Sequence, residues 1–251
     1  MIQRHIKILE LLTEHKKIEV AKLAELIQVS QVTARRDLDQ LEAQTLVSRE
    51  HGYALIGSHD DMNNRLAYHY DAKKAIAAAA AACVADGETV MVESGSCCAI
   101  LAAELAAARR GITIITNSAF IVAYIRKYAG VNIVLLGGDF QPEAQVMVGP
   151  ITKKCAEEFF VDKLFIGTDG HSEKSGFTAK DRRRAEAVRD MAKQAANVII
   201  LTESEKFSRQ GVVSLIDTKQ VSKIYTDNSI LEADEIHLQA QGVEVIKIIK
   251  K

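Results

Sequence analysis

The sequence has few of the residues that mark linkers, disulfide frameworks and metal sites. Among its 251 residues are two prolines and no tryptophan, which excludes extended proline-rich linkers. Its four cysteines, at positions 83, 97, 98 and 155, form no C-x-x-C pair, so neither zinc binding nor a disulfide framework is expected. The longest apolar run, Ala75–Val84, is mostly alanine and too short to span a bilayer. These absences predict a cytoplasmic protein with reduced thiols, no membrane segment, no metal and no cofactor.

Neither sign of charge is in excess. The net charge is −1 and the pI is about 6.7. Residues 1–57 contain eight lysines and arginines and eight aspartates and glutamates. The basic footprint typical of nucleic-acid binding is therefore missing, and any such function must be argued from local pattern. With 48% apolar residues, the chain has enough material for more than one core.

Three helices are predicted near the N-terminus. Apolar residues recur at helical spacing over 3–15, and again over 20–26. Ser30 is a favourable N-cap for a third helix, predicted over Gln31–Gln44. Two short helices, a tight turn and a third helix are typical of the helix-turn-helix motif.

One face of the third helix is predicted to be buried and the other exposed. Ala34, Leu38 and Leu41 share the apolar face. Polar side chains of the opposite face can donate to bases and phosphates, and Val32 can contact a thymine methyl. The candidate DNA-binding residues here are Ser30, Gln31, Val32, Thr33, Arg35, Arg36 and Gln40. The pattern alone leaves the alternative that this is a solvated helix face.

A hairpin is predicted after the third helix. Residues 46–49 and 53–56 are expected to be strands, and His51-Gly52 suits the tight turn between them. Such a hairpin is the wing of a winged helix-turn-helix domain, which we assign to residues 1–57. Arg49 and His51, near its tip, are predicted to reach the DNA backbone.

The rest of the chain is predicted to be a separate α/β domain. Residues 58–70 are polar and are expected to be a linker. From residue 71 to residue 251, apolar strands alternate with helices, beginning with an alanine-rich helix over 71–85. This alternation indicates a larger domain with a mostly parallel sheet covered by helices.

The loops after successive strands contain small polar residues. In parallel sheets, ligands bind at the carboxyl ends of strands. The loop 93–97 (ESGSC) lies between a strand and a helix, where a glycine turn and the helix N-terminus favour a phosphate. Further loops are 116–118, 137–139, 167–170 and 203–207. Each alone could be an ordinary turn, but together they suit a polyhydroxylated anion.

These motifs resemble those of the DeoR family of bacterial regulators. The run S-x-x-T-x-R-R-D-L at 30–38 and the later order E-S-G-S, T-N-S, G-G, D-x-x-F-I-G, G-F-T and S-x-K-F carry the resemblance. It implies that the third helix enters the major groove, and that Asp37 orients an arginine or caps locally. It also implies a C-terminal domain similar in fold to ribose-5-phosphate isomerase and glucosamine-6-phosphate deaminase. The implied effector-binding residues are Lys73, Ser94, Gly95, Ser96, Thr116, Asn117, Gly137, Gly138, Asp169 and Lys206.

The resemblance also implies a function. It predicts a repressor of a sugar-catabolic operon that binds double-stranded operator DNA and is released by a phosphorylated sugar. A homodimer or homotetramer is expected, because paired half-sites are read by symmetric oligomers. The chain departs from the family at Cys97, where threonine is usual, and at Glu203, where aspartate is usual.

Two other functions are considered. A sugar-phosphate isomerase or deaminase with an appended DNA-binding module would need a general base, for which the loops offer Glu93, Asp169 and Glu203. No acid–base pair is marked by spacing, so no catalytic residue is assigned. A thiol-based sensor would use Cys97 and Cys98, although a buried inert thiol is the more common state of a free cysteine.

Overall fold

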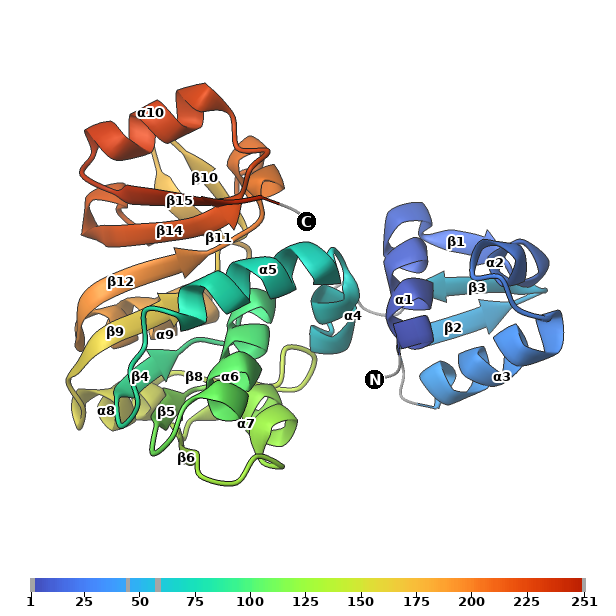
Figure 1. Ribbon diagram of the computed structural model, residues 1–251, viewed down its shortest axis with the longest axis horizontal. Coiled ribbons are helices and arrows are strands. Elements are labelled where there is room, and N and C mark those ends of the chain that lie inside the picture. The colour runs from blue at the N-terminus through green and yellow to red at the C-terminus, as the bar shows by residue number, and fades with distance from the viewer. Residues whose placement is uncertain (1–2, 44–45, 57–59, 250–251) are drawn as a thin grey trace. The chain divides into compact units, whose positions relative to one another are not determined.

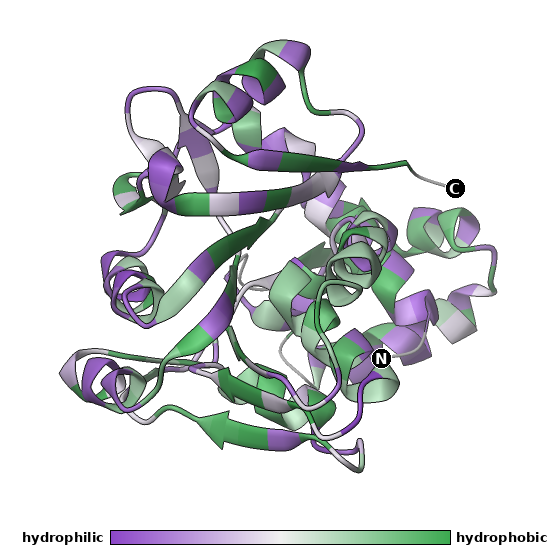
Figure 2. Ribbon diagram, turned by 60° about the vertical axis from the view of Figure 1, so that its left-hand side comes forward, coloured by the Kyte–Doolittle hydropathy of each residue, from purple (hydrophilic) through white to green (hydrophobic). Residues whose placement is uncertain are grey.

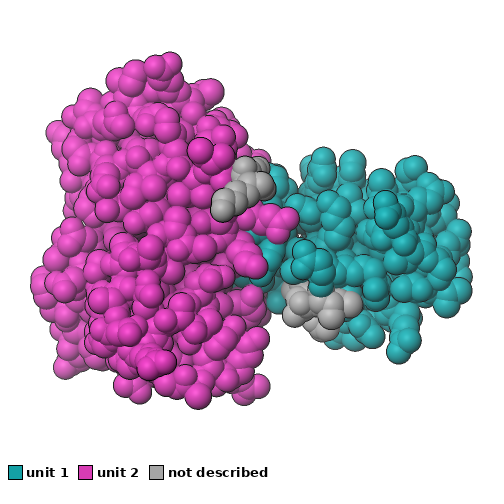
Figure 3. Space-filling view, viewed as in Figure 1, with its two compact units in different colours: residues 1–70 teal, residues 71–251 magenta. Residues whose placement is uncertain are grey.

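The computed structural model describes residues 3–43, 46–56 and 60–249. The chain divides into two compact units, residues 1–70 and residues 71–251, which are coloured separately in Figure 3. The predicted end of the first domain, between residues 57 and 58, lies outside the described ranges. Within those ranges, none of the helices has both the length and the apolar character needed to cross a membrane.

The smaller unit has the predicted helix-turn-helix plan with a wing (Figure 1). Its three strands form one antiparallel sheet in the order β1-β3-β2. Apolar residues of all three main helices meet in one core. Because each helix turns one side to this core, its apolar residues recur at helical spacing in the sequence. The elements are α1 (Gln3–His15), β1 (Lys17–Glu19), α2 (Val20–Leu26), α3 (Gln31–Glu42), β2 (Val47–Glu50), β3 (Tyr53–Ile56) and α4 (Met62–Ala67).

Helix α3 begins where the sequence predicted. The Ser30 hydroxyl accepts a hydrogen bond from the Thr33 N–H at 3.1 Å, which caps the helix. Ala34, Leu38 and Leu41 are fully buried, as the helical wheel required. The helix ends at Glu42, so the predicted end at Gln44 was too late, and Gln44 itself lies outside the described residues.

The wing is a two-residue hairpin. Strands β2 and β3 pair up to Glu50 and Tyr53, which leaves only His51 and Gly52 in the turn. Their φ angles are +48° and +85°. Positive φ at both central residues is the tight turn that matches the twist of the flanking strands, and the prediction of this hairpin is confirmed.

Helix α4 lies in the segment predicted as linker. The Asp61 carboxylate accepts from the Asn63 N–H at 2.8 Å and caps it. Met62, Leu66 and Ala67 are buried, and α4 packs against α1. The linker prediction was wrong for these residues, because the surrounding aspartates and asparagines hid three apolar positions that are buried in a short helix.

The larger unit is built on a seven-stranded sheet in which all neighbours are parallel. Along the chain, strands are first added on one side of β4, in the order β5 and β6. Later strands are added on the other side, from β9 to β12, β14 and β15. The direction therefore switches between β4 and β9, the place where α/β sheets bind ligands. Across the sheet the strands are β15 (Glu244–Ile248), β14 (Val221–Asp227), β12 (Ala195–Leu201), β9 (Val161–Ile166), β4 (Thr89–Val92), β5 (Thr113–Thr116) and β6 (Asn132–Leu135).

Helices cover both faces of this sheet (Figure 1). Right-handed crossovers that run in opposite directions from the switch point place their helices on opposite faces. On one face lie α5 (Tyr70–Ala81), α6 (Ser96–Ala108) and α7 (Ala119–Ile125). The other face carries α8 (Pro150–Glu157), α9 (Arg182–Ala192) and α10 (Glu232–Ala240). Pro150 is the first residue of α8, where its fixed φ and missing N–H are compatible with a helix start.

Two small antiparallel sheets are inserted between the parallel units, and the sequence predicted neither. Strands of three or four residues carry too little periodicity to be recognised. One sheet is the hairpin of β7 (Asp139–Gln141) and β8 (Val146–Val148). The other sheet contains β10 (Gly170–Ser172), β11 (Gly176–Ala179) and β13 (Val213–Ile216), and two 3-10 turns, η1 (Ser204–Ser208) and η2 (Thr218–Gln220), flank β13.

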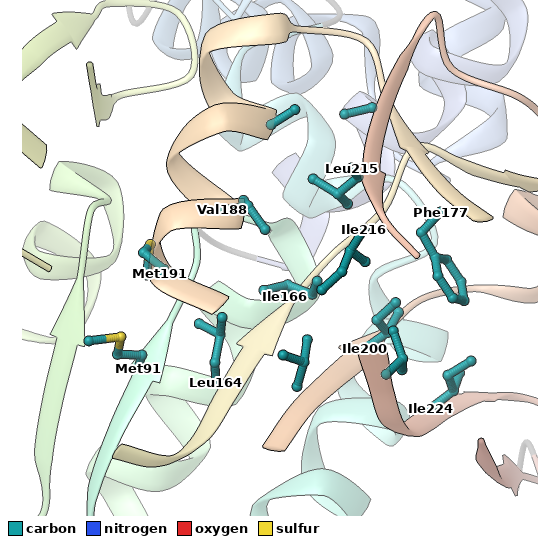
Figure 4. Close-up of a cluster of buried hydrophobic side chains, with 14 of the residues drawn as sticks. Met91, Leu164, Ile166, Phe177, Val188, Met191, Ile200, Leu215, Ile216 and Ile224 are labelled. Atoms are coloured by element: carbon teal, nitrogen blue, oxygen red, sulfur yellow. The ribbon is translucent and has the colours of Figure 1, made fainter. Parts of the chain in front are cut away.

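The main core of the larger unit lies between the sheet and α9. Figure 4 shows Leu164 and Ile166 of β9 packed toward Val188 and Met191 of α9. Phe177 of the small sheet closes the same cluster. Figure 2 shows the corresponding pattern along the chain, with central strands mostly hydrophobic and helices of mixed character.

The burial of each leucine predicts how much its side chain contributes to the free energy of unfolding. Leu164 is fully buried, whereas Leu231 is 67% exposed. Leu164→Ala should lower the free energy of unfolding of the larger unit by about 2–5 kcal/mol, measured by urea denaturation. Leu231→Ala should change it by less than about 0.5 kcal/mol. Equal effects of the two substitutions would contradict the assigned core.

Candidate DNA-binding surface and effector site

Helix α3 presents a free polar face. Val32 is 77% exposed, which is unusual for an apolar side chain. Arg35 and Arg36 are exposed and make no hydrogen bond or ion pair with any described residue. Ser30 and Thr33, by contrast, share a hydroxyl–hydroxyl hydrogen bond of 2.9 Å at the cap. The exposed members of the predicted set on this helix are Gln31, Val32, Arg35, Arg36 and Gln40.

Asp37 holds α1 against α3. Its buried carboxylate accepts hydrogen bonds from the Arg4 guanidinium, whose Nη2 lies 2.8 Å from Asp37 Oδ1. The Nε2 atom of His5 is 3.4 Å from the same oxygen. The Arg4 hydrogen bonds lower the pKa of Asp37, although burial acts in the opposite direction. Asp37 thus orients an arginine, as the resemblance implied, and this arginine belongs to α1.

Arg49 connects the wing to α3. Its Nη2 lies 2.7 Å from Asp39 Oδ1 and 2.6 Å from Glu42 Oε2, and its N–H donates to Glu42 Oε1 at 3.1 Å. Hydrogen bonding to Glu42, followed by the negative charges of Glu42 and Asp39, raises the pKa of Arg49. Arg49 is predicted to contact the DNA backbone. To do so, its guanidinium would have to bind a phosphate as well as Asp39 and Glu42. His51, at the tip of the wing, is exposed.

The Glu93 carboxylate joins two loops at the switch point of the sheet. Its Oε2 accepts from the N–H of Gly95 at 2.9 Å and of Gly167 at 3.2 Å. Its Oε1 accepts from the Ser94 hydroxyl at 2.8 Å. A Cβ on Gly95 would lie 3.4 Å from the Gly167 Cα, so the two loops touch. The sequence pattern indicates Glu93 only as a candidate base, because a contact 74 positions away leaves no local signal.

The N-terminus of α6 faces no capping side chain. Gly95 is its N-cap and supplies no side-chain acceptor. Ser96, the first residue of the helix, is half-buried. The first N–H groups of a helix carry partial positive charge and are a favourable position for an anion. Ser94 and the Gly95 N–H are already engaged by Glu93, so the remaining donors are those of Ser96 and the residues after it.

Asn117 is held by the β7–β8 hairpin and keeps one free acceptor. Its Nδ2 donates to the Met147 carbonyl at 3.1 Å, and its own carbonyl accepts from the Met147 N–H at 2.7 Å. Asn117 is only 1% exposed, yet its Oδ1 has no hydrogen-bond partner among the described residues. The neighbouring Thr116 hydroxyl oxygen accepts from the Ser118 N–H at 3.1 Å and shapes the turn.

The Gly137-Gly138 loop is fixed by α8. The Thr152 hydroxyl donates to the Gly137 carbonyl at 2.7 Å. Gly138 has a φ of +148°, and a Cβ there would lie 2.0 Å from the Thr152 Oγ1. Only glycine fits this position, because both the backbone angle and the neighbouring helix exclude a side chain.

Two more predicted residues lie on rigid turns. The Asp169 Oδ2 accepts from the Lys180 N–H at 2.9 Å. The Lys206 Nζ lies 3.3 Å from Glu205 Oε1. The turn η1 that carries Lys206 is fixed to the small sheet, where the N–H of His171 donates to the Arg209 carbonyl at 2.9 Å.

Lys73 and Glu203 form a buried ion pair. The Lys73 Nζ is 3.2 Å from Glu203 Oε1, and their side chains are 3% and 6% exposed. Burial favours the neutral carboxyl, but the charges of Lys73 and Lys206 outweigh it and lower the pKa of Glu203. This pair joins α5 to the loop after β12.

Cys97 lies against the same carboxylate, with its Sγ 3.8 Å from Glu203 Oε2. Complete burial, followed by the nearby negative charge of Glu203, raises the pKa of the Cys97 thiol well above its ordinary value. The thiol is therefore protonated and protected from solvent, which disfavours the thiol-sensor hypothesis.

The predicted effector residues thus fall into two contact groups. The loops after β4, β9 and β12, with Lys73, are joined through Glu93 and Glu203. The loops after β5 and β6 are held instead by β8 and α8. Together with an exposed α3, this arrangement defines a transcriptional regulator with a DNA-binding unit and an α/β sensor unit.

Comparison with known families agrees with this class. Residues 4–59 match the DeoR-like helix-turn-helix domain, and residues 68–228 match the DeoR C-terminal sensor domain. The chain belongs to the DeoR family.

Named relatives cover nearly the whole chain. The HTH-type transcriptional repressor GlcR of Bacillus subtilis is 29% identical, over 97% of this chain and 95% of its own length. The transcriptional repressor AccR of Agrobacterium fabrum is also 29% identical, over 90% and 89%. Ribose 5-phosphate isomerase A of Methanocaldococcus jannaschii is 18% identical and covers 55% of each chain, with a TM-score of 0.41. Both of these relatives are named as transcriptional repressors.

The exposed arginines predict a selective loss of DNA binding. Arg36→Ala should weaken operator binding by about 1–3 kcal/mol per site, measured by fluorescence anisotropy, while the thermal unfolding profile stays unchanged. Arg182, 76% exposed at the start of α9, provides the matched control. If Arg182→Ala weakened binding as much as Arg36→Ala, the assignment of α3 as the DNA-reading helix would be wrong.

The buried ion pair predicts a stability effect that depends on pH. Lys73→Met leaves Glu203 buried without its main partner and should cost about 3–5 kcal/mol at pH 7. Because the folded-state pKa of Glu203 is lowered, its stabilising contribution is complete above the ordinary glutamate pKa and is lost as pH falls through the folded value. The difference between wild type and variant in urea unfolding should therefore shrink in acid.

The double variant Lys73→Met with Glu203→Gln serves as control for the ion pair. It removes both charges and should lose less stability than the single lysine variant. A pH-independent loss, equal in the two variants, would show that the charge pair is not what Lys73 contributes.

Proposed function

We propose that this DeoR-family regulator represses a sugar-catabolic operon and is released from its operator by a phosphorylated sugar. The observation that carries the proposal is the pair of surfaces in one chain. One unit exposes arginines that have no partner among the described residues on a recognition helix, and the other gathers glycines, hydroxyls and a helix N-terminus at the switch point of a parallel sheet.

The polar groups at the switch point suit a phosphorylated sugar. The uncapped N-terminus of α6 supplies N–H donors for a phosphate. The exposed Lys180 side chain, next to the Asp169 loop, makes no ion pair with any described residue and adds positive charge. On the neighbouring loop after β5, the Oδ1 of Asn117, which has no hydrogen-bond partner among the described residues, is an acceptor for a sugar hydroxyl.

The switch requires that the effector bind one state of the protein better than the other. A ligand with equal affinity for both states would change nothing. An anionic sugar that interacts with Lys73 or Lys206 competes with Glu203 for the same cations. In this proposal that competition supplies the difference in affinity.

The geometry does not favour the isomerase or deaminase alternative. Each of the three carboxylates considered as a base is already engaged. Glu93 accepts from Gly95 and Gly167, Asp169 accepts from the Lys180 N–H, and Glu203 pairs with Lys73. A general base must instead be free to reach the proton it abstracts.

A thermal-shift screen against a panel of sugar phosphates tests the effector. A true effector at 100 times its Kd should stabilise the sensor unit by about 2.7 kcal/mol. The corresponding unphosphorylated sugar and inorganic phosphate are the controls, and each should give a much smaller shift. Lys206→Ala should reduce the shift without removing the ion pair of Lys73 and Glu203. If no sugar phosphate stabilised the protein more than inorganic phosphate did, the effector class would be wrong.

A further inference from the structure

The larger unit buries a histidine between aromatic rings. His171 of β10 is only 4% exposed. Its ring centroid lies 4.6 Å from that of Phe177 on β11 and 5.7 Å from that of Phe207 on η1. Both phenylalanines are buried members of the main hydrophobic cluster. An ionisable ring therefore occupies a place that otherwise belongs to the core.

The His171 ring also has polar neighbours. Its Nε2 lies 3.3 Å from the hydroxyl oxygen of Thr218 on η2. The ring of His237 on α10 is 5.9 Å away, centroid to centroid, and the Nδ1 of His237 is 3.9 Å from Oε1 of the exposed Glu173. His237 and Glu173 are the ionisable groups that act on His171 among the described residues. The side chains that meet the ring from β11, η1 and η2 carry no charge, and they are Phe177, Phe207 and Thr218.

The backbone of His171 is bonded to the end of η1. Its N–H donates to the Arg209 carbonyl at 2.9 Å, and the Arg209 N–H donates to the Lys206 carbonyl at 3.2 Å. A Cβ on Gly170 would lie 2.3 Å from the Arg209 carbonyl oxygen, so the strand and the turn are in direct contact. Lys206, a predicted effector residue, precedes Phe207 in η1. The ring and the backbone of His171 thus fix the same turn.

The His171 ring is neutral in this environment. Burial, followed by repulsion from His237, lowers its pKa from 6.5 to about 4, although Glu173 acts in the opposite direction. If the turn opened and water reached the ring, the pKa would return toward its ordinary value. Because the folded-state pKa is lowered, the stabilising contribution of the ring is complete above pH 6.5 and is lost as pH falls from 6.5 toward 4.

We propose that His171 is a positioning residue for the effector site, and that its neutral ring holds η1, and with it Lys206, against β10. The ring is too enclosed to contact a ligand itself, so it acts only through the turn. Protonation places a charge among aromatic rings, which is unfavourable and frees the turn. The link to effector binding rests on the proposed function, whereas the hold on the turn does not.

Hydrogen–deuterium exchange of the full-length protein, without DNA or sugar, tests this hold. Peptides that cover residues 203–209 are followed from pH 7.5 to pH 5 and corrected for the intrinsic exchange rate. In the wild type, the opening equilibrium of the turn should rise roughly tenfold or more, because the opened turn binds a proton below pH 6.5 and the closed turn does so only near pH 4. The range stays above 4.5, the ordinary pKa of the buried Glu203, whose own pKa is lowered. A ring that only filled space would leave the turn equally stable across the range.

Three variants identify the group responsible. His171→Gln keeps an amide near Thr218 but cannot ionise, so exchange in the turn should no longer depend on pH in this range. His237→Gln removes the neighbouring charge, so it should raise the pKa of His171, measured by NMR titration of the ring protons, and reduce the pH-dependent opening. His15→Gln, at an exposed position of α1, is the matched control and should behave as the wild type.

A turn that opens in acid in the wild type and in His15→Gln, but not in His171→Gln, supports the proposal. Equal exchange in the wild type at both ends of the range, a His171→Gln variant that keeps the pH dependence, or a His171 pKa near 6.5 would each overturn it. The wild-type profile and the NMR titration decide the matter even if His171→Gln does not fold. Because no DNA or sugar is present, these outcomes are distinguishable from failure of the proposed function.

Discussion

The Glu93 carboxylate is the contact on which the candidate effector site depends. Along the chain, strands are added outward from β4 on one side of the sheet and outward from β9 on the other. The loops after β4 and β9 therefore leave the sheet side by side, at the switch point. Glu93 accepts the N–H groups of Gly95 and Gly167 there, and a Cβ at Gly95 would lie 3.1 Å from Glu93 Oε2, so a larger residue at Gly95 would press on this carboxylate. A buried carboxylate satisfied by backbone donors fixes the start of α6 and therefore the direction of its free N–H groups.

A second buried carboxylate connects this site to the start of the sensor unit. Glu203 pairs with Lys73, which lies two residues beyond Asp71, the first residue of that unit. Charged groups that are removed from solvent are stable only while they remain paired. A ligand that changes this pairing therefore changes the energy of the helix that follows the DNA-binding unit in the chain. In the DNA-binding unit, Asp37 and Glu42 hold Arg4 and Arg49, while Arg35 and Arg36 are exposed and make no hydrogen bond or ion pair with a described residue.

The sequence predicted most of the fold, because the signals that specify it are local. The periodicity of α1 to α3, the Ser30 cap, the His51-Gly52 turn and the alternation of strands and helices all appeared where expected. Prediction failed where the determining contact is distant or the element is short. Neither α4, hidden among polar residues, nor the small antiparallel sheets could be recognised. The pairing of Arg49 with Glu42, and of Glu93 with Gly167, required the structure. The roles of the predicted site residues toward DNA and effector remain predictions.

We propose that occupancy of the switch-point site lowers the affinity of the protein for DNA. Linkage requires that an effector which favours the unbound form weaken operator binding, and that operator DNA weaken effector binding by the same factor. The most direct measurement is a fluorescence-anisotropy titration of the full-length protein on DNA upstream of its own gene. It is carried out at low salt, with and without the sugar phosphate that stabilises the protein most. The account predicts tight binding without the sugar phosphate and at least about tenfold weaker binding with it, a coupling typical of allosteric proteins. Equal affinity in the two titrations, or no binding in either, would contradict it.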